Sequence, residues 1–240
     1  MGFTHVASHQ AWYAAVNALF GGIKKFKDDY AKPIEIDRDL HAHLKGWFTN
    51  ESNFTIHQAD ALQFDYGQLI KPEHALRVVG NLPYNISTPL IFHLLGYASA
   101  IRDMHFMLQK EVVQRMAAGP GGGDYGRLSV MVQYRCKVEA LFIVPPGAFN
   151  PPPKVESAVV RLTPFATPPH PAQDEACLRQ VVNAAFQQRR KTLRNGLKGL
   201  ITAEALESLG IDSKLRAEQL PLADFVRISN AISGNPENNE

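Results

Sequence analysis

The chain has 240 residues, 45% of them hydrophobic and 20% charged, which is the composition of an ordinary soluble globular protein. The formal net charge is only +2, so a nucleic-acid surface would have to come from local clustering of basic residues. The two cysteines, Cys136 and Cys177, lie far apart without zinc-ligand spacing, which argues against a zinc site or a disulfide framework and fits a reducing compartment.

The N-terminal segment, residues 1–33, predicts an amphipathic helix. Its apolar residues fall at helical spacing; they are Trp12, Ala15, Val16, Leu19, Phe20, Ile23 and Phe26. The segment lacks the basic-then-apolar pattern of a secretory signal, and no apolar run in the chain approaches the roughly 20 residues of a membrane span. We therefore expect a cytoplasmic protein that does not contact a membrane.

Short apolar runs alternate with helical patterns from about residue 34 to residue 118. The runs predict strands at residues 33–36, 54–57, 76–79 and 104–108. Helical stretches lie between several of them, notably at residues 88–95 and 111–118. This alternation predicts a parallel sheet with helices on both faces.

The second half of the chain changes from sheet to helix. Glycines at residues 117–126 predict a flexible loop, and a proline-rich connection leads into an alternating strand at residues 157–162. Residues 163–175 resemble a linker, and the apolar residues beyond it fall at helical spacing; they are Leu178, Val181, Val182, Ala185 and Phe186. We therefore predict an atypical segment at residues 1–33, a sheet domain at residues 34–165 and a small all-α domain at residues 166–240.

Carboxylates follow the first two predicted strands. Ligands of open parallel sheets bind outside the carboxyl ends of the strands. Glu35 would accept hydrogen bonds from both hydroxyls of a ribose, and Asp60 would accept one from an adenine amino group. Simpler explanations stay open, because Glu35 stands among other charged residues and a lone Asp is often a helix cap or turn residue.

The turn after the third strand, GNLPYNISTPL at residues 80–90, carries the strongest chemical signal. An adenine amino nitrogen is a poor nucleophile because its lone pair is delocalised, and two acceptors, one for each N–H, would favour the nucleophilic geometry. Asn81 would supply one acceptor, and Pro83 restricts Leu82 to an extended conformation that presents its carbonyl as the other. Tyr84 offers a face for stacking a base, a contact worth ~1–3 kcal/mol. An ordinary strand-to-helix turn is the alternative.

A basic stretch lies in the predicted helical domain. Residues 176–203 contain no acidic residue, and their basic residues are Arg179, Arg189, Arg190, Lys191, Arg194 and Lys198. Arg190, Arg194 and Lys198 recur every four residues, which predicts one basic stripe along a helix. Such a stripe fits RNA phosphates, although a solvated helix face is the commoner explanation.

Several blocks of this sequence together resemble one family closely. The blocks are GNLPYNISTPLIFHLL, DMHFMLQKEVVQRM, YGRLSVMVQY, PPGAFNPPPKVESAVVRL and QRRKTLRNGL, and the resemblance runs from about Ile34 to Ala231. They are similar to the small-subunit (16S) ribosomal RNA adenine N6,N6-dimethyltransferases. The resemblance implies a Rossmann-like class I methyltransferase sheet domain that uses S-adenosyl-L-methionine and acts on 16S rRNA in the small ribosomal subunit.

The resemblance also implies roles for individual residues. Glu35 would hold the cofactor ribose, Asp60 the cofactor adenine, and Asn81 would lie between cofactor and target base. Leu82 would supply the carbonyl, with Tyr84 stacking on one face of the target adenine. Phe149 would close its other face, although a core aromatic before a proline turn explains Phe149 equally well. Arg189, Arg190, Lys191, Arg194 and Lys198 would bind RNA, and we expect a monomer without a metal ion.

The N-terminus departs from the family pattern. The family has a strand running into a Glu-x-Gly-x-Gly-x-Gly type loop that lets backbone amides approach the methionine end of the cofactor. Residues 1–33 contain no such loop, since their only tight glycine pair is Gly21-Gly22. The missing strand would be the central one, so we expect open sheet edges, weak cofactor binding and impaired activity.

These observations favour an enzyme that transfers methyl groups to two adjacent adenosines (N6) near the 3′ end of 16S rRNA. The related 23S rRNA adenine dimethylase is an alternative within the same chemistry. A non-catalytic rRNA-binding ribosome assembly factor is an alternative of another class, and the missing glycine loop is the feature that favours it.

Overall fold

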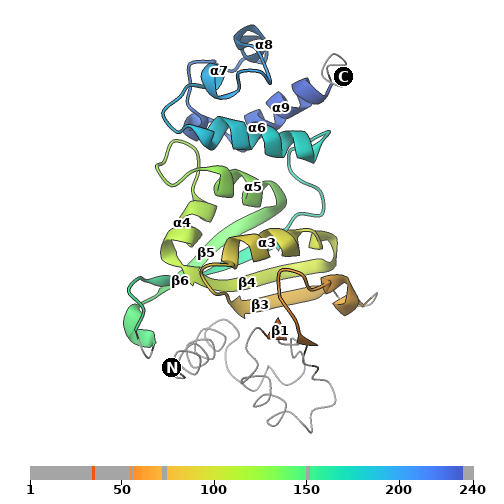
Figure 1. Cartoon of the computed structure of the whole chain (residues 1–240), viewed down its shortest axis with the longest axis vertical. Coiled ribbons are helices and arrows are strands. Elements are labelled where there is room, and N and C mark those ends of the chain that lie inside the picture. The colour runs from red at the N-terminus through yellow and green to blue at the C-terminus, as the bar shows by residue number, and fades with distance from the viewer. Residues whose placement is uncertain (1–33, 36–54, 56, 72–74, 150–151, 235–240) are drawn as a thin grey trace. The chain divides into compact units, whose positions relative to one another are not determined.

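The computed structural model describes residues 34–35, 55, 57–71, 75–149 and 152–234, and Figure 1 draws the others as a thin grey trace. The predicted helix within residues 1–33, and the predicted loss of the first strand and glycine loop, lie outside the described residues. The described chain divides into two compact units. Unit 1 comprises the described residues up to Lys110 together with Ala140–Pro164, and unit 2 comprises Glu111–Glu139 together with Phe165 onward.

Two short strands open unit 1. β1 (Ile34–Glu35) and β2 (His57–Gln58) pair in parallel, with Ile34 opposite His57 and Glu35 opposite Gln58. The second strand begins later than the sequence pattern predicts. Because the two strands are parallel, their carboxyl ends meet at one edge, as predicted for a cofactor-binding sheet.

A four-stranded sheet has the order β3-β4-β6-β5 (Figure 1). Its strands are β3 (Leu76–Asn81), β4 (Ile101–Gln109), β5 (Cys136–Val144) and β6 (Ser157–Pro164). β3 and β4 are parallel, whereas β4 and β6 are antiparallel. The strand pairs predicted within residues 34–118 are parallel, as expected, and the antiparallel β6, whose direction was not predicted, makes the sheet mixed.

β4 lies in the interior of this sheet between β3 and β6. Its residues from Asp103 to Leu108 are all buried. A strand covered on both faces reads as a continuous apolar run rather than an alternating one, and the MHFML stretch has that form. The buried Asp103 is compensated by Arg77 on β3, whose Nε and Nη2 atoms each donate to a carboxylate oxygen at 2.8 Å.

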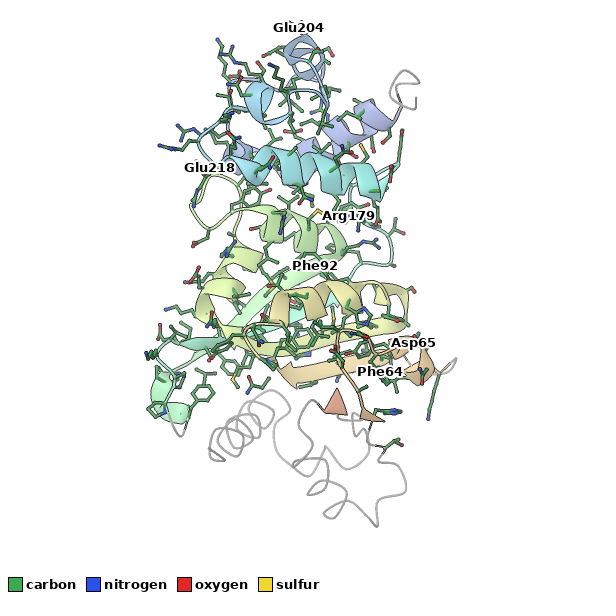
Figure 2. The ribbon with its side chains drawn as sticks, viewed as in Figure 1. Phe64, Asp65, Phe92, Arg179, Glu204 and Glu218 are labelled. Atoms are coloured by element: carbon green, nitrogen blue, oxygen red, sulfur yellow. The ribbon has the colours of Figure 1, made fainter. Side chains whose placement is uncertain are left out.

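Helices and a short aromatic segment complete unit 1. The parallel pair β3 and β4 is connected by α3 (Ser87–Leu95), which buries its apolar stripe of Leu90, Ile91, Leu94 and Leu95. Short 3₁₀ turns lie at Tyr66–Leu69, Ala98–Ala100 and Pro146–Ala148. Figure 2 labels Phe64, in the segment between β2 and β3, which is buried, and Phe92 on α3, which is exposed.

Unit 2 is helical apart from the start of β5. Its elements are α4 (Lys110–Ala117), α5 (Arg127–Arg135), α6 (Glu175–Gln187), α7 (Leu193–Gly196), α8 (Ala203–Ser208), a 3₁₀ turn (Ala217–Gln219) and α9 (Leu222–Ser233). α6 begins at Asp174, which accepts a hydrogen bond from the Ala176 amide at 2.7 Å. Its apolar stripe packs in a core with Tyr134, Leu193, Leu197 and Phe225.

The sequence analysis missed two elements, α5 and β5. The residues of α5 mix apolar and charged types without a clear helical period, and their burial comes from contacts with segments distant in sequence. In β5, Cys136, Val138 and Ala140 alternate with charged residues, so this strand pattern was present in the sequence and was overlooked. The boundary near residue 165 also differs from the packing, because α4 and α5 group with the C-terminal helices. The functional division at that residue stays a prediction.

Membrane-spanning helices and metal-binding clusters are both absent from the part of the chain that the structure describes. No helix there is long and apolar enough to cross a membrane. No group of three or more His, Cys, Asp or Glu side chains there is arranged to hold a metal ion.

Candidate active site

The chain leaves the four-stranded sheet at Asn81, the last residue of β3. Asn81 lies opposite Met107 of β4. The Leu82 amide donates to the Met107 carbonyl at 3.2 Å, and this is the last backbone hydrogen bond between β3 and β4. Pro83 follows and has no N–H, so the pairing ends there. The Asn81 side chain is half-buried and makes no hydrogen bond to any described residue. No described residue therefore occupies its amide oxygen.

Leu82 is fixed by its own side chain. That side chain is buried, and it folds back over Gly80, where a Cβ atom would lie only 3.0 Å from Leu82 Cδ2. Glycine at position 80 thus gives Leu82 the room to pack inward. The Leu82 carbonyl accepts no backbone hydrogen bond from a described residue, which agrees with its predicted role as the second acceptor but does not test it.

Tyr84 lies in the turn between β3 and α3. The Ile86 amide donates to the Pro83 carbonyl at 3.1 Å, and the buried Ser87 hydroxyl donates to the Tyr84 carbonyl at 3.1 Å. The Tyr84 side chain is 39% exposed, and its hydroxyl lies 3.0 Å from the Ser157 Oγ atom at the start of β6. The sequence analysis did not single out Ser157, because a lone serine before an apolar strand gives no sign of a partner so distant in sequence.

Phe149 is brought to the same end of the sheet. It is half-buried and packs with Met107 and Val159, which lie opposite each other on β4 and β6. Met107 is also the residue that faces Asn81 on β3. Both interpretations of Phe149 are therefore compatible with the structure, since the ring contributes to a small core cluster and also lies near the end of β3.

The two predicted cofactor carboxylates lie at the carboxyl ends of β1 and β2, since Glu35 is the last residue of β1 and Asp60 follows β2 by two residues. The backbone of Glu35 pairs with Gln58, and the Glu35 side chain lies outside the described part of the chain. The exposed Asp60 caps the turn after β2: its Oδ1 atom accepts from the Leu62 amide at 2.9 Å and its Oδ2 atom from the Gln63 Nε2 atom at 3.3 Å. A carboxylate has about four acceptor positions, so this turn orients Asp60 while leaving it able to accept from a ligand.

Aromatic side chains lie beneath the Asp60 turn. Phe64 and Tyr66 meet edge to face with ring centroids 5.2 Å apart, and the Tyr66 hydroxyl donates to the Ala61 carbonyl at 3.2 Å. Burial, with smaller contributions from Tyr97 and the charge of Asp60, raises the pKa of Tyr66 to about 12. The Tyr66 phenol is therefore neutral at physiological pH and serves as a rigid support for the turn.

The predicted basic helical stripe is wrong in its geometry. α6 ends at Gln187, Arg190 lies in a turn, Arg194 lies in α7, and Lys198 follows it. A helix continued past Gln187 would place Arg189 four residues beyond buried Ala185, on the stripe that faces the core. The chain breaks instead, and Leu193 and Leu197 become the buried residues of the next segment.

The basic side chains of this segment are exposed, although they do not lie on one helix. Arg190, Lys191, Arg194 and Lys198 make no ion pair with any described residue. Arg189 differs from them, because its Nη2 atom donates to the Gly123 carbonyl at 2.5 Å and its Nε atom lies 3.4 Å from Glu218. Arg189 therefore ties the glycine-rich loop to the segment after α6 and to Glu218 within unit 2, a structural role that the sequence did not indicate.

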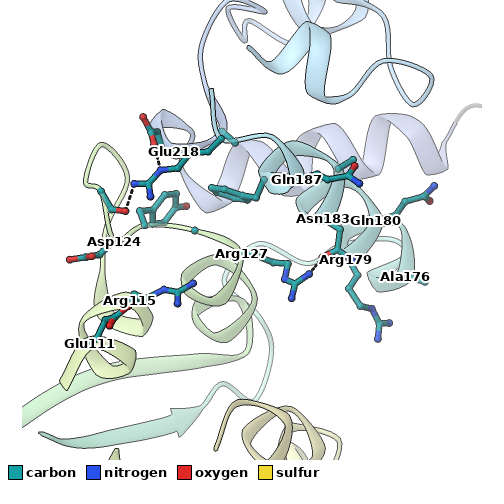
Figure 3. A pocket seen from close by; sticks show the side chains of 17 residues that line it. Glu111, Arg115, Asp124, Arg127, Ala176, Arg179, Gln180, Asn183, Gln187 and Glu218 are labelled. Atoms are coloured by element: carbon teal, nitrogen blue, oxygen red, sulfur yellow. Dashed lines mark hydrogen bonds and ion pairs between the residues drawn. The ribbon is translucent and has the colours of Figure 1, made fainter. Parts of the chain in front are cut away.

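A groove of about 1040 Å³ within unit 2 is lined by α4, the glycine-rich loop, α5 and α6 (Figure 3). Arg115, Arg127 and Arg179 line it from three different helices. Arg127 donates to the Asn183 Oδ1 atom at 3.2 Å, and none of the three pairs with a described carboxylate. Glu111, Asp124 and Glu218 also line the groove. Arg189 lines the groove as well, and of these four arginines Arg179 and Arg189 belong to the basic stretch noted in the sequence.

The sequence of this chain matches one protein family and several proteins of known name. A family model described as ribosomal RNA adenine dimethylase matches residues 26–233. The ribosomal RNA small subunit methyltransferase A of Pseudomonas aeruginosa is 64% identical over 205 residues, which cover 85% of this chain and 76% of that protein. The protein of the same name from Hahella chejuensis is 58% identical over 207 residues, which cover 86% of this chain and 76% of that protein.

Two solved structures are similar as well. A dimethyladenosine transferase from Plasmodium falciparum matches with a TM-score of 0.67 and 26% identity, covering 81% of this chain and 78% of its own. The 23S rRNA methyltransferase ErmE matches with a TM-score of 0.62 and 23% identity, covering 88% of this chain and 85% of its own. The second likeness shows the fold alone, and together they confirm the predicted class I methyltransferase fold.

Proposed function

The chain belongs to the ribosomal RNA adenine dimethylase family, whose methyl donor is S-adenosylmethionine, and we propose that it dimethylates the N6 atoms of two adjacent adenosines near the 3′ end of 16S rRNA in the small ribosomal subunit. The names of its bacterial relatives support the small-subunit substrate. The sequence blocks NPPPKVESAVVRL and RRKTLRNGL also favour this substrate over 23S rRNA.

The observation that carries the proposal is the unpaired amide of Asn81. A half-buried amide at the carboxyl end of a sheet strand, without a hydrogen-bond partner among the described residues, is an acceptor held ready for a ligand. An adenine N6 group has two N–H donors. The Asn81 oxygen would take one of them, and the Leu82 carbonyl, whose position follows from the buried Leu82 side chain, would take the other.

Bonds to both N–H groups favour the pyramidal form of the amino nitrogen, which directs its lone pair at the methyl group. The donor is a sulfonium and already activated, so each transfer forms one N–C bond as one S–C bond breaks, and the amine loses a proton. Tyr84 would stack on one face of the target adenine once that base has left its strand, and Phe149 would close the other face.

Glu35 and Asp60 fit the ribose and adenine ends of the cofactor in kind. Glu35 ends one of two neighbouring parallel strands and Asp60 follows the other, and the carboxyl ends of these strands share one edge. The Asp60 carboxylate is oriented by its bonds to Leu62 and Gln63 and retains unused acceptor positions. Glu35 would accept from the two ribose hydroxyls.

Two groups of cations are proposed to meet RNA phosphates. The first is the exposed set Arg190, Lys191, Arg194 and Lys198, with Arg189 contributing beside its structural bonds. The second is the groove set Arg115, Arg127 and Arg179, of which only Arg179 was part of the basic stretch in the sequence. Cations without a carboxylate partner in the protein are the ones that gain most from a phosphate, because no existing ion pair has to break.

The remaining features follow from the chemistry. The activated sulfonium needs no Lewis acid, so we propose that transfer proceeds without a metal ion. Because Asn81, Leu82, Tyr84 and Phe149 all come from one chain, the proposed active unit is a monomer. It would act where small subunits are assembled, in the cytoplasm.

The proposed substrate is tested by comparing methyl transfer to small subunits with methyl transfer to 23S rRNA. Unmethylated small subunits and unmethylated 23S rRNA are incubated separately with the chain, in excess, and cofactor labelled in its methyl group. We expect label in the small-subunit RNA only. Label in the 23S rRNA instead would favour the large-subunit alternative.

A non-catalytic RNA-binding assembly factor remains a second candidate because residues 1–33 contain no Gly-x-Gly loop. Such a factor would bind small subunits without binding the cofactor. Calorimetric titration of the chain with S-adenosylmethionine separates the two, since even weak saturable heat supports the enzyme. No heat together with tight subunit binding would support the assembly factor.

A further inference from the structure

The hydroxyl of Tyr84 has a partner that the proposed stacking role does not require. Stacking a base needs only the ring, yet the Tyr84 hydroxyl lies 3.0 Å from the Ser157 Oγ atom, across 73 positions of sequence. Ser157 is only 1% exposed, whereas the Tyr84 side chain is 39% exposed. One end of the ring is thus attached to the interior of unit 1 while the ring itself remains accessible.

Ser157 is itself held rigidly. It is the first residue of β6 and lies opposite Gln109 of β4 in the antiparallel ladder. Two positions further along β6, Val159 lies opposite Met107, which in turn faces Asn81 on β3. The Ser157 hydroxyl and the Asn81 backbone are therefore positioned by the same strand, β4.

Tyr84 is fixed at two points. Its carbonyl accepts from the buried Ser87 hydroxyl at 3.1 Å, which holds the backbone at the start of α3. The bond to Ser157 then restrains the far end of the ring. Within the described residues Ser157 Oγ has no other hydrogen-bond partner, so a buried hydroxyl is satisfied only when the ring has this orientation.

We infer that Ser157 is a positioning residue for methyl transfer: it holds the Tyr84 ring in the orientation that stacks the target adenine against the acceptors of the Asn81–Leu82 turn. This inference rests on the proposed function and adds a residue to the same site. It assigns the Tyr84 hydroxyl an orienting role and no part in proton transfer.

A double-mutant cycle tests the inference. Tyr84→Phe, Ser157→Ala and the double variant each remove the same hydrogen bond. We expect each to lower the single-turnover rate by about two- to tenfold, the range of one net hydrogen bond, with the affinity for small subunits unchanged. The double variant should be no slower than either single variant. Losses that multiply in the double variant would overturn the inference.

Ser229→Ala is the matched control, because Ser229 is also a buried serine, and it lies in unit 2 on α9. Its hydroxyl donates to the Asp174 carbonyl at 3.4 Å. We expect its loss to lower the melting temperature without changing the rate of transfer. A rate loss equal to that of Ser157→Ala would mean that both report on general stability, and the inference would fail.

A spectroscopic readout separates this inference from the proposed function. In protein carrying ¹³C-labelled tyrosine rings, the Tyr84 signals are identified by their loss in Tyr84→Phe. They should shift in Ser157→Ala and stay in place in Ser229→Ala; unshifted signals in Ser157→Ala would overturn the inference, whatever the activity. If the chain transfers no methyl group at all, the proposed function fails and the positioning role falls with it. Transfer with multiplying losses rejects the inference alone.

Discussion

The sequence indicates two candidate functional regions, the turn at residues 80–84 and the basic segment at residues 189–198. They differ in how closely their local structure follows the sequence pattern. The turn has the local form that its residues predict, because Pro83 ends the pairing of β3 and the buried Leu82 fixes the backbone. The basic segment does not form the predicted continuous helix, because α6 ends at Gln187. Proline and glycine chemistry acts within a few residues, whereas helical periodicity is overridden by packing of Leu193 and Leu197.

The contrast predicts different kinds of functional effect. Single substitutions in the turn should change the rate of methyl transfer without changing RNA affinity. Substitutions in the basic segment should lower RNA affinity without changing the rate of methyl transfer, because its separate cations all bind the same RNA. The experiments below test this contrast, from the largest expected effect to the smallest.

Asn81→Ala removes the side-chain acceptor from the turn. Loss of one positioned polar group at a reacting centre costs on the order of 10²–10³ in rate. We expect this loss in single-turnover methylation of small subunits, measured in the chain and in a version with a glycine loop, with RNA affinity largely intact. Asn85→Ala, an exposed amide four residues on, serves as control. A variant that keeps most of its rate would remove Asn81 from the reaction centre.

Restoring a glycine loop in place of residues 1–33 should raise the rate. Without backbone amides to hold the methionine end of the cofactor, a misplacement of ~1 Å costs about a hundredfold. The 240-residue chain should accordingly bind S-adenosylmethionine weakly, transfer slowly and tend to aggregate. Comparable turnover by the two versions would show that residues 1–33 do form a working cofactor site.

Tyr84→Ala and Tyr84→Phe separate the ring from its hydroxyl. Base stacking is worth ~1–3 kcal/mol, so removing the ring should slow transfer by about 5- to 150-fold. Tyr84→Phe keeps the ring and loses only the bond to Ser157, so its effect should stay within about tenfold. Single-turnover rates measure both. Equal and severe losses would show that the hydroxyl takes part in the reaction itself.

Neutralising the basic segment should change the salt dependence of binding. Replacing Arg190, Arg194 and Lys198 by Gln should flatten the plot of log affinity against log salt by ~2–3 units if each meets a phosphate. The same measurement on Arg115, Arg127 and Arg179 tests the groove. Arg227→Gln is the control, because Arg227 already pairs with Asp224 at 2.9 Å. An unchanged slope would show that the neutralised set does not contact phosphates and is only solvated surface.

The sequence predicted most of what proline, glycine and hydrophobic runs determine locally. The existence of β3, β4, β6, α3, α4 and α6 is confirmed, with boundaries shifted by a few residues. The antiparallel direction of β6 was not predicted, because the pairing of distant strands leaves little local trace. The same holds for α5, whose burial depends on contacts with segments far away in sequence, whereas the alternation at residues 136–140 could have revealed β5.

The residues of the candidate site divide in the same way, into those that the local sequence reveals and those that only the folded chain reveals. Asn81, Leu82 and Tyr84 were visible in the sequence because an unusual tetrapeptide stands at the end of an apolar run that predicts a strand. Ser157, Arg115 and Arg127 were not, because each gains its significance from partners brought close only by folding. The roles of Glu35, Asp60 and Phe149 stay predictions that mutation has yet to test.

One measurement tests the central claim most directly. Unmethylated small subunits are treated with the chain and with Asn81→Ala, and the RNA is then examined for N6,N6-dimethyladenosine by nucleoside analysis and by primer-extension stops. We predict dimethyladenosine at two adjacent positions near the 3′ end of 16S rRNA, formed slowly by the chain and far more slowly by Asn81→Ala. Dimethylation at another site, or equal product from Asn81→Ala, would contradict the account.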